Sequence, residues 1–187
     1  MSGSSDRRGF VSAFVSVVSA LVLGRGRTSA QGQSAESRLR ELGLTLPAAP
    51  APIATYVRAV KVGNLLFVSG HGPAAAADGK TFSGKVGRDL TLEEGRTAAR
   101  LVGLNVLASV RSSLGSLDRV VRVVKVLGMV NAADNFTQQP QVVNGFSDLM
   151  VEIFGEERGK GARSAVGMGS LPNDIPVEVE AIFEVEG

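Results

Sequence analysis

The longest β-type run in the sequence, residues 118–130, most constrains the fold. It consists largely of β-branched residues and predicts one long strand. Arg119, Arg122 and Lys125 fall within this run, so the strand must have an exposed side. The chain is therefore expected to contain a sheet with one face that is not fully buried.

Segments with helical spacing lie on both sides of this strand. Thr91 begins the sequence Thr-Leu-Glu-Glu, a capping box in which the Thr hydroxyl and the Glu carboxylate each satisfy a backbone N–H. Apolar spacing typical of a helix then continues to Leu114. A second helix is predicted to begin at Asn135 or Thr137, and a short one covers residues 34–42.

Further β-rich runs supply the other strands. They cover residues 56–61, 65–69, 162–168 and 177–185. The order β-β-α-β-α-β-β predicts an α+β fold in which both helices cover one face of a mixed sheet. Because apolar residues occupy both faces of several strands, we expect the uncovered face to pack against a partner in a cyclic oligomer. Residues 70–90 are long for a structureless loop and are expected to form a lid or short strands.

Residues 1–33 are predicted to be a leader outside the folded domain, which we assign to residues 34–187. The leader is Arg-rich, Ser-rich, acid-poor and amphipathic, which is typical of a mitochondrial or plastid transit peptide. One alternative is a secretory signal cleaved after Ala30, which would make the protein secreted or periplasmic. The other is an unprocessed or artificially added tail on a cytoplasmic protein. The apolar stretch is shorter than the roughly 20 residues that cross a bilayer.

Composition narrows the possible chemistry. The chain has no cysteine and one histidine, which excludes disulfides, thiolate catalysis and the usual zinc clusters. We therefore expect neither a metal nor a cofactor. The leader has four arginines and one aspartate, a net charge of +3, so the remaining residues have a net charge of −1 within the total of +2. The folded domain is near neutral, and nucleic-acid binding is not expected.

The last two strands contain charged residues. Arg163 lies among apolar and small residues, where an unpaired guanidinium is costly. One interpretation is an ion pair with Glu178 or Glu180; the other is a planar fork that binds the carboxylate of a substrate. Glu178 and Glu180 share one face of their strand. They form either a solvated strand face or a site in which one of them positions water or a substrate nitrogen.

Residues near the first two strands are further candidates. Tyr56, the only tyrosine, is either a packing residue or points its hydroxyl into a pocket. Ser69 and Gly70 end the second strand, where the glycine either makes a turn or lets a ligand approach closely. We interpret His71 as a residue of a pocket rim or of a surface loop.

Three segments together resemble the Rid family of reactive intermediate deaminases, also called the YjgF or L-PSP endoribonuclease family. They are residues 56–70 with Val-Gly-Asn-Leu-Leu-Phe-Val-Ser-Gly, residues 162–166 (Ala-Arg-Ser-Ala-Val), and residues 171–181 with Leu-Pro-Asn-Asp and Val-Glu-Val-Glu-Ala. The resemblance covers about residues 50–187. The segment 148–155 resembles a divergent branch with a longer loop after the second strand, and His71 stands where glutamine is usual.

The resemblance implies a chorismate-mutase-like α+β fold assembled as a homotrimer, with active sites in clefts between subunits. Members of the family hydrolyse 2-imino acids, released by pyridoxal-phosphate dehydratases, to 2-keto acids and ammonia. By motif match, Arg163 would bind the carboxylate and Glu178 would lie near the attacking water. The substrate-binding residues would be Tyr56, Ser69, Gly70, His71, Asn144 and Ser164.

Two other functions compete with the predicted deaminase. An endoribonuclease or translation inhibitor requires a basic groove and a general acid–base pair, and the domain's charge of −1 and single histidine count against both. A non-catalytic binding protein or holdase would use the same cleft for small carboxylates. In each case we expect no membrane association of the mature domain.

Overall fold

The structure, a computed structural model, describes residues 33–52 and 54–187. The predicted leader lies, up to residue 32, outside the described residues, so its assignment stays a prediction. Within the described ranges, no helix combines the length and the hydropathy that a membrane span requires.

The first two helices form where the sequence predicts them. In α1 (Ala35–Glu41), Ser34 is the N-cap and its hydroxyl accepts a hydrogen bond from the backbone N–H of Ser37. α2 (Leu92–Leu114) begins with the complete capping box at Thr91. It ends at Gly115, whose φ of 84° is a left-handed conformation that glycine adopts without strain.

Several predicted boundaries shift. β1 (Ala59–Val62) begins three residues after the predicted start at residue 56, and β2 (Leu65–His71) ends two residues after the predicted end at residue 69. α3 (Gln139–Phe154) begins later than Asn135 or Thr137, and Pro140 lies in its first turn. Proline fits there because a backbone N–H in the first turn has no partner within the helix. The long strand begins at Val120 because residues 117–119 form a 3₁₀ turn. A short helix, α4 (Glu156–Gly159), follows α3 and was not predicted.

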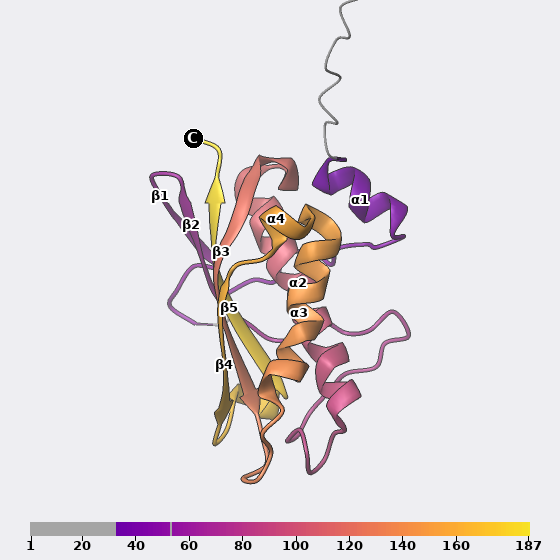
Figure 1. Cartoon of the computed structure of the whole chain (residues 1–187). Coiled ribbons are helices and arrows are strands. Elements are labelled where there is room, and N and C mark those ends of the chain that lie inside the picture. The colour runs from indigo at the N-terminus through magenta and orange to yellow at the C-terminus, as the bar shows by residue number, and fades with distance from the viewer. Residues whose placement is uncertain (1–32, 53) are drawn as a thin grey trace, which may run out of the picture. The chain divides into compact units, whose positions relative to one another are not determined.

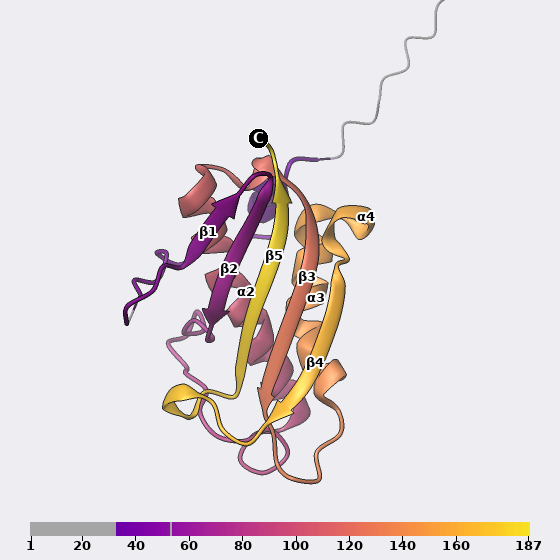
Figure 2. The same ribbon diagram turned by 90° about the vertical axis from the view of Figure 1, so that its left-hand side faces the viewer.

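The strands of the described chain form one mixed sheet in the order β1-β2-β5-β3-β4. They are β1 (Ala59–Val62), β2 (Leu65–His71), β3 (Val120–Asn131), β4 (Ala162–Met168) and β5 (Val177–Val185). β4 is parallel to β3, whereas all other neighbours are antiparallel. The last strand in the sequence therefore lies at the centre of the sheet, between β2 and β3 (Figure 2).

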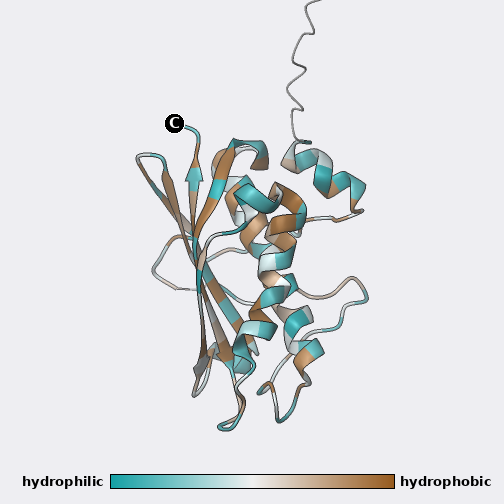
Figure 3. Cartoon of the chain, in the orientation of Figure 1, coloured by the Kyte–Doolittle hydropathy of each residue, from teal (hydrophilic) through white to brown (hydrophobic). Residues whose placement is uncertain are grey.

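α2 and α3 pack side by side on one face of the sheet (Figure 1). The core between the two layers includes Val106, Phe146, Leu149 and Phe183, none of which is exposed. The strands carry long hydrophobic stretches, coloured brown in Figure 3, whereas the short α1 is mostly hydrophilic. The predicted α+β fold with two helices on one face is confirmed.

The opposite face of the sheet is uncovered in the described part of the chain (Figure 2). Apolar side chains are exposed on it. By strand register these include Val60, Val62, Phe67 and Val166. Several exposed apolar residues on one face of a sheet are typical of an interaction site.

The connection between β2 and α2 is anchored to the domain. Val86 is fully buried, and its backbone exchanges hydrogen bonds with Asn131 O (2.8 Å) and Ala133 N (3.0 Å). It forms isolated β-bridges with Leu90 and Ala132 but no strand. The expectation of short strands is therefore wrong, and the part of the connection around Val86 is packed against the rest of the domain.

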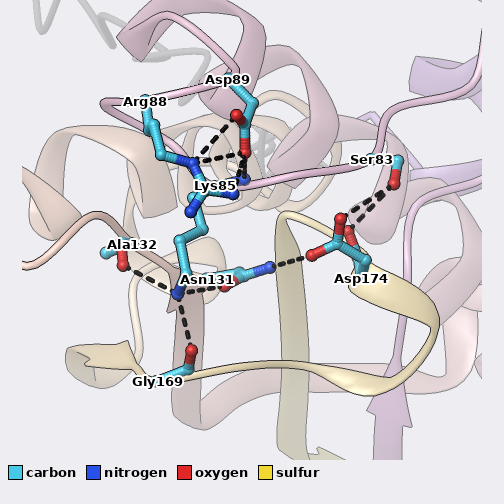
Figure 4. Close-up of polar contacts among 8 residues, drawn as sticks. All are labelled: Ser83, Lys85, Arg88, Asp89, Asn131, Ala132, Gly169 and Asp174. Carbon is cyan, nitrogen blue, oxygen red and sulfur yellow. Dashed lines mark hydrogen bonds and ion pairs between the residues drawn. The ribbon is translucent and has the colours of Figure 1, made fainter.

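Lys85, in the same connection, forms further hydrogen bonds to the rest of the domain (Figure 4). Its Nζ donates to Asn131 Oδ1 (3.0 Å), Ala132 O (3.2 Å) and Gly169 O (2.6 Å). The fully buried Asn131 donates in turn from Nδ2 to Asp174 Oδ1 (3.0 Å). One buried amide thus links the loop, the end of β3 and the turn before β5.

Candidate functional site

Arg163 extends from the edge strand β4 toward α3. Its Nη1 donates to Asn144 Oδ1 (2.9 Å) and to Ser147 Oγ (3.0 Å), and its Nη2 donates to the Pro140 carbonyl oxygen (3.4 Å). Positions 140, 144 and 147 follow the i, i+4, i+7 spacing of one helical face. The N-terminal half of α3 therefore fixes the guanidinium; Asn144 contacts Arg163, and its role in substrate binding stays a prediction.

The guanidinium has neutral partners. Among the described residues, it makes no ion pair with Glu178, Glu180 or another carboxylate. The interpretation of Arg163 as half of an internal salt bridge is therefore wrong. It lines a small cavity of about 240 Å³ together with Ser147 and Lys160. A half-buried, hydrogen-bonded arginine without an acidic partner is suited to binding an external anion.

Ser69 and Gly70 lie in a β-bulge of β2. Val68 pairs with Ala181 and His71 with Val179, so β2 has one more residue than β5 between these pairs. The bulge brings Gly70 against the side chain of Glu178, and a Cβ at position 70 would overlap Glu178 Oε1. Any larger residue at position 70 would therefore displace the Glu178 carboxylate.

Glu178 is a half-buried carboxyl group. Burial raises its pKa above the ordinary value, and the negative charge of Glu180 raises it further. The two glutamates pair in register with Met129 and Leu127, so they share the uncovered face, as the alternation of the strand predicts. A raised pKa favours the protonated form of this carboxyl, a property that suits a group that exchanges protons with a ligand.

His71 lies in the core and not on a pocket rim or a surface loop. It is 1% exposed. Its Nδ1 lies 2.6 Å from Ser69 O and its Nε2 lies 2.7 Å from Ser109 Oγ. Because a carbonyl oxygen only accepts, Nδ1 carries the proton and Nε2 accepts from the Ser109 hydroxyl. Burial lowers the pKa of His71, so the ring is neutral and ties the bulge to α2.

Ser69 and Ser164 line a hollow of about 500 Å³ on the uncovered face. Ser164 accepts a hydrogen bond from Lys125 Nζ (3.0 Å). Ser69 Oγ donates to Arg58 O (3.2 Å). Tyr56 is more than one third exposed and packs against Arg58, whose guanidinium carbon lies 5.3 Å from the ring centroid.

The expected site residues of one chain thus fall into two groups on opposite faces of the sheet. Arg163 pairs in register with the buried Val126, on the face that the helices cover. Glu178 pairs with Met129, which has the opposite parity in β3. A ligand that touches both Arg163 and Glu178 must therefore contact two chains.

Sequence reasoning missed two residues near these groups. Ser147 holds the Arg163 guanidinium, and it follows Asn144 by three positions, so helical spacing alone predicts that the two share a face. In the sequence, Lys125 indicated only that its strand has an exposed side. In the structure it lines the hollow beside Ser164. No sequence signal reveals this contact, because it depends on the pairing of β3 with β4.

Comparisons with known proteins agree on one family. Residues 36–175 match the family described as "YjgF/chorismate mutase-like, putative endoribonuclease". The chain is 46% identical over 149 residues to Protein TCP17 of Trypanosoma cruzi, a match that covers 80% of this chain and 92% of that protein. The crystal structure of Atu1372 from Agrobacterium tumefaciens, a protein of unknown function, is similar with a TM-score of 0.73 and 43% identity, covering 81% of this chain and 92% of that one.

More distant relatives have functional names. The chain is 29% identical to the 2-iminobutanoate/2-iminopropanoate deaminase of Dermatophagoides farinae, over 76% of this chain and 95% of that protein. It is 31% identical to Protein MMF1, mitochondrial, of Saccharomyces cerevisiae, over 72% and 77% respectively.

Proposed function

Because the chain belongs to the YjgF/chorismate mutase-like family, we propose that it is a hydrolytic deaminase of 2-imino and enamine acids, which it converts to 2-keto acids and ammonia. The observation that carries this proposal is the Arg163 guanidinium, which neutral groups of α3 hold and no described carboxylate neutralises. A substrate carboxylate is the anion that it would bind. The name of the 29% identical deaminase supports the same reaction class.

The proposed assembly of subunits rests on the positions of Arg163 and Glu178 on opposite faces of the sheet. Arg163 on the β4 edge of one subunit would meet the Gly70–Glu178 corner of the next, and closure of this contact in a ring gives the homotrimer that we expect. The exposed apolar residues of the uncovered face favour burial between subunits. The substrate would then lie in a cleft between two chains.

The reaction needs little from the protein. Water adds to the carbon of the protonated C=N bond, a proton moves to nitrogen, and the C–N bond breaks as ammonia leaves and the C=O bond forms. Glu178 would accept the proton of the attacking water and return it to the leaving nitrogen, which suits a carboxyl with a raised pKa. Arg163 would hold the carboxylate in place, a contribution of about 1.5–3 kcal/mol. No step requires a metal or an organic cofactor.

A coupled assay tests the proposal. A threonine dehydratase generates 2-iminobutanoate, and the release of 2-ketobutyrate is followed with and without the purified protein. We expect acceleration by the wild type and little or none by Arg163→Ala. Absence of acceleration by the wild type would reject the deaminase function for this substrate and leave a non-catalytic carboxylate-binding protein.

The same two proteins test the RNA-cleaving alternative that the family description contains. Purified wild type and Arg163→Ala are incubated with labelled RNA. Cleavage that depends on Arg163 would favour the endoribonuclease, whereas equal cleavage by both would indicate a contaminant or another site.

A further inference from the structure

Two polar side chains of α2 bind the end of β2. Asn105 and Ser109 are four positions apart, so they lie on the same side of the helix. Asn105 Nδ2 donates to the Gly72 carbonyl oxygen (3.0 Å). The Ser109 hydroxyl, on a residue that is 2% exposed, donates to His71 Nε2 (2.7 Å). A buried hydroxyl lowers stability unless it has a partner, and its partner here is the last residue of β2.

His71 connects α2 with the β-bulge of β2. Its Nδ1 donates to the Ser69 carbonyl oxygen (2.6 Å). Ser69 is also held from the side of β1, because its backbone N–H and its hydroxyl both donate to Arg58 O (3.0 and 3.2 Å). The bulge is therefore fixed between the residue that precedes β1 and a histidine of the core.

The bulge in turn limits the space of the Glu178 carboxylate. Gly70 lies between Ser69 and His71 in the chain, and a Cβ on it would overlap Glu178 Oε1. His71 pairs in register with Val179, the next residue of β5. A continuous path of hydrogen bonds and backbone thus leads from the core to the carboxylate, and a shift of the bulge would move the surface against which Glu178 rests.

We propose that His71 is the positioning residue of Glu178. Held by Ser109, the neutral ring fixes the bulge at Ser69 and Gly70, and the bulge fixes the place of the carboxylate. The inference rests on the proposed deaminase function, in which Glu178 accepts the proton of the attacking water. His71 is buried and acts through the backbone. A leucine at position 71 would fill the core but would leave the Ser69 carbonyl oxygen without its donor.

The titration of Glu178 tests this positioning without any use of activity. The glutamate carboxyl carbons are labelled with ¹³C in the full-length protein in its native assembly, and the Glu178 signal is assigned by its loss in Glu178→Gln. Burial raises the pKa of Glu178, so a carboxylate that turns toward solvent beside a relaxed bulge should titrate at lower pH. We expect this shift in His71→Leu and a smaller one in Ser109→Ala. His71→Gln, whose amide has both a donor and an acceptor, should restore the wild-type midpoint.

Steady-state kinetics test the consequence for the reaction. Arg163 would still bind the substrate carboxylate, so KM in the dehydratase-coupled assay should change less than about 3-fold. The kcat of His71→Leu should fall about 10- to 100-fold, because the base loses its alignment, and His71→Gln should recover it. Ser113→Ala is the matched control. Its hydroxyl lies one turn further along α2 and donates to the Ser109 carbonyl oxygen (2.9 Å), so both measurements should match the wild type.

Failure of this inference differs from failure of the deaminase function. If the wild type does not accelerate release of 2-ketobutyrate, the deaminase function fails for this substrate, and the Glu178 titration alone decides the role of His71. If His71→Leu does not fold, Ser109→Ala gives the decision. The proposal is overturned if the Glu178 midpoint of the folded variants equals that of the wild type, or if His71→Gln behaves like His71→Leu.

Discussion

Gly70 lies so close to Glu178 that a Cβ at position 70 would overlap the Oε1 atom of the glutamate. The contact joins the bulge of β2 to the start of β5. The backbone at position 70 thereby limits where the Glu178 carboxylate can lie.

Gly70→Ala should separate activity from stability. The added methyl group meets the mobile end of a side chain, so the carboxylate moves, and we expect the free energy of unfolding to change by no more than about 1 kcal/mol. Deaminase activity should fall by about 10- to 100-fold, because a displaced catalytic group loses its alignment. Gly169→Ala is the control, since a Cβ there meets nothing within 4 Å. Equal activity of the two variants would remove Glu178 from the mechanism.

Glu180→Gln should shift the pH profile of the proposed reaction. Burial raises the pKa of Glu178 first, and the charge of Glu180 raises it second. Removal of that charge lowers the pKa of Glu178. If the ionised Glu178 is the base, activity is lost as the pH falls through this pKa, so the acidic limb of kcat/KM should move to lower pH in the variant. Glu184→Gln, on the same strand face, serves as comparison; an identical shift in both would assign the effect to overall charge.

His71 should make the fold sensitive to mild acid. Its pKa in the folded chain is lowered from 6.5, chiefly by burial, so the unfolded chain binds a proton more readily. The stability that depends on neutral His71 is fully present above the unfolded pKa of about 6.5 and is lost as the pH falls from there toward the lowered folded pKa. Urea unfolding between pH 7.5 and 5.5 should show this slope in the wild type and a flatter one in His71→Gln. Parallel curves would mean that other groups cause it.

Lys85→Met should loosen the loop between β2 and α2. The substitution leaves the buried Oδ1 of Asn131 without its donor, which costs about 1–3 kcal/mol of stability. Amide exchange at Val86 and Ala133 should accelerate, because the Val86 N–H donates to Asn131 O and the Ala133 N–H donates to Val86 O, and both bonds hold the loop at the end of β3. Lys61→Met removes an exposed lysine whose only described bond is to the Glu186 carbonyl, and it should cost well under about 1 kcal/mol. Unchanged exchange in Lys85→Met would contradict the anchoring role.

Mixed assemblies test whether the proposed cleft uses two chains. Arg163→Ala and Glu178→Gln should each be inactive alone. If they are unfolded and refolded together, some contacts pair the intact Arg163 of one variant with the intact Glu178 of the other, about a quarter of them by random assortment. Activity should return to roughly that fraction of the wild type. No recovery, with mixed assemblies verified by mass, would place both residues in a site within one chain.

The sequence predicts the elements of the fold better than the positions of the site residues. Capping at Ser34 and Thr91 and the apolar spacing of α2 and α3 are local signals, and local structure follows them. His71 was predicted to lie beyond the end of the second strand, on a pocket rim or in a surface loop, whereas β2 continues to His71. The bulge inserts one residue and reverses the parity, so His71 turns inward and Gly70 meets Glu178.

The partners of Arg163 show a second limit of what the sequence can predict. Among the described residues Arg163 has no acidic partner. This depends on which face of the sheet β4 presents to α3, and that follows from the parallel pairing of β4 with β3. Strand pairing is a long-range property, so neither composition nor spacing within β4 reveals it. Asn144 was nevertheless anticipated, since it came from the family resemblance and not from spacing.

The central position of β5 has a consequence for synthesis of the protein. The ribosome makes β5 after the other four strands of the sheet, yet β5 lies between β2 and β3 and pairs with both. The β1–β2 hairpin and the β3–α3–β4 unit can each form earlier, but until residues 177–185 emerge they have facing strand edges without hydrogen-bond partners. A nascent chain halted before Val177 would consist of two incomplete half-sheets, exposed to aggregation and in need of chaperone protection.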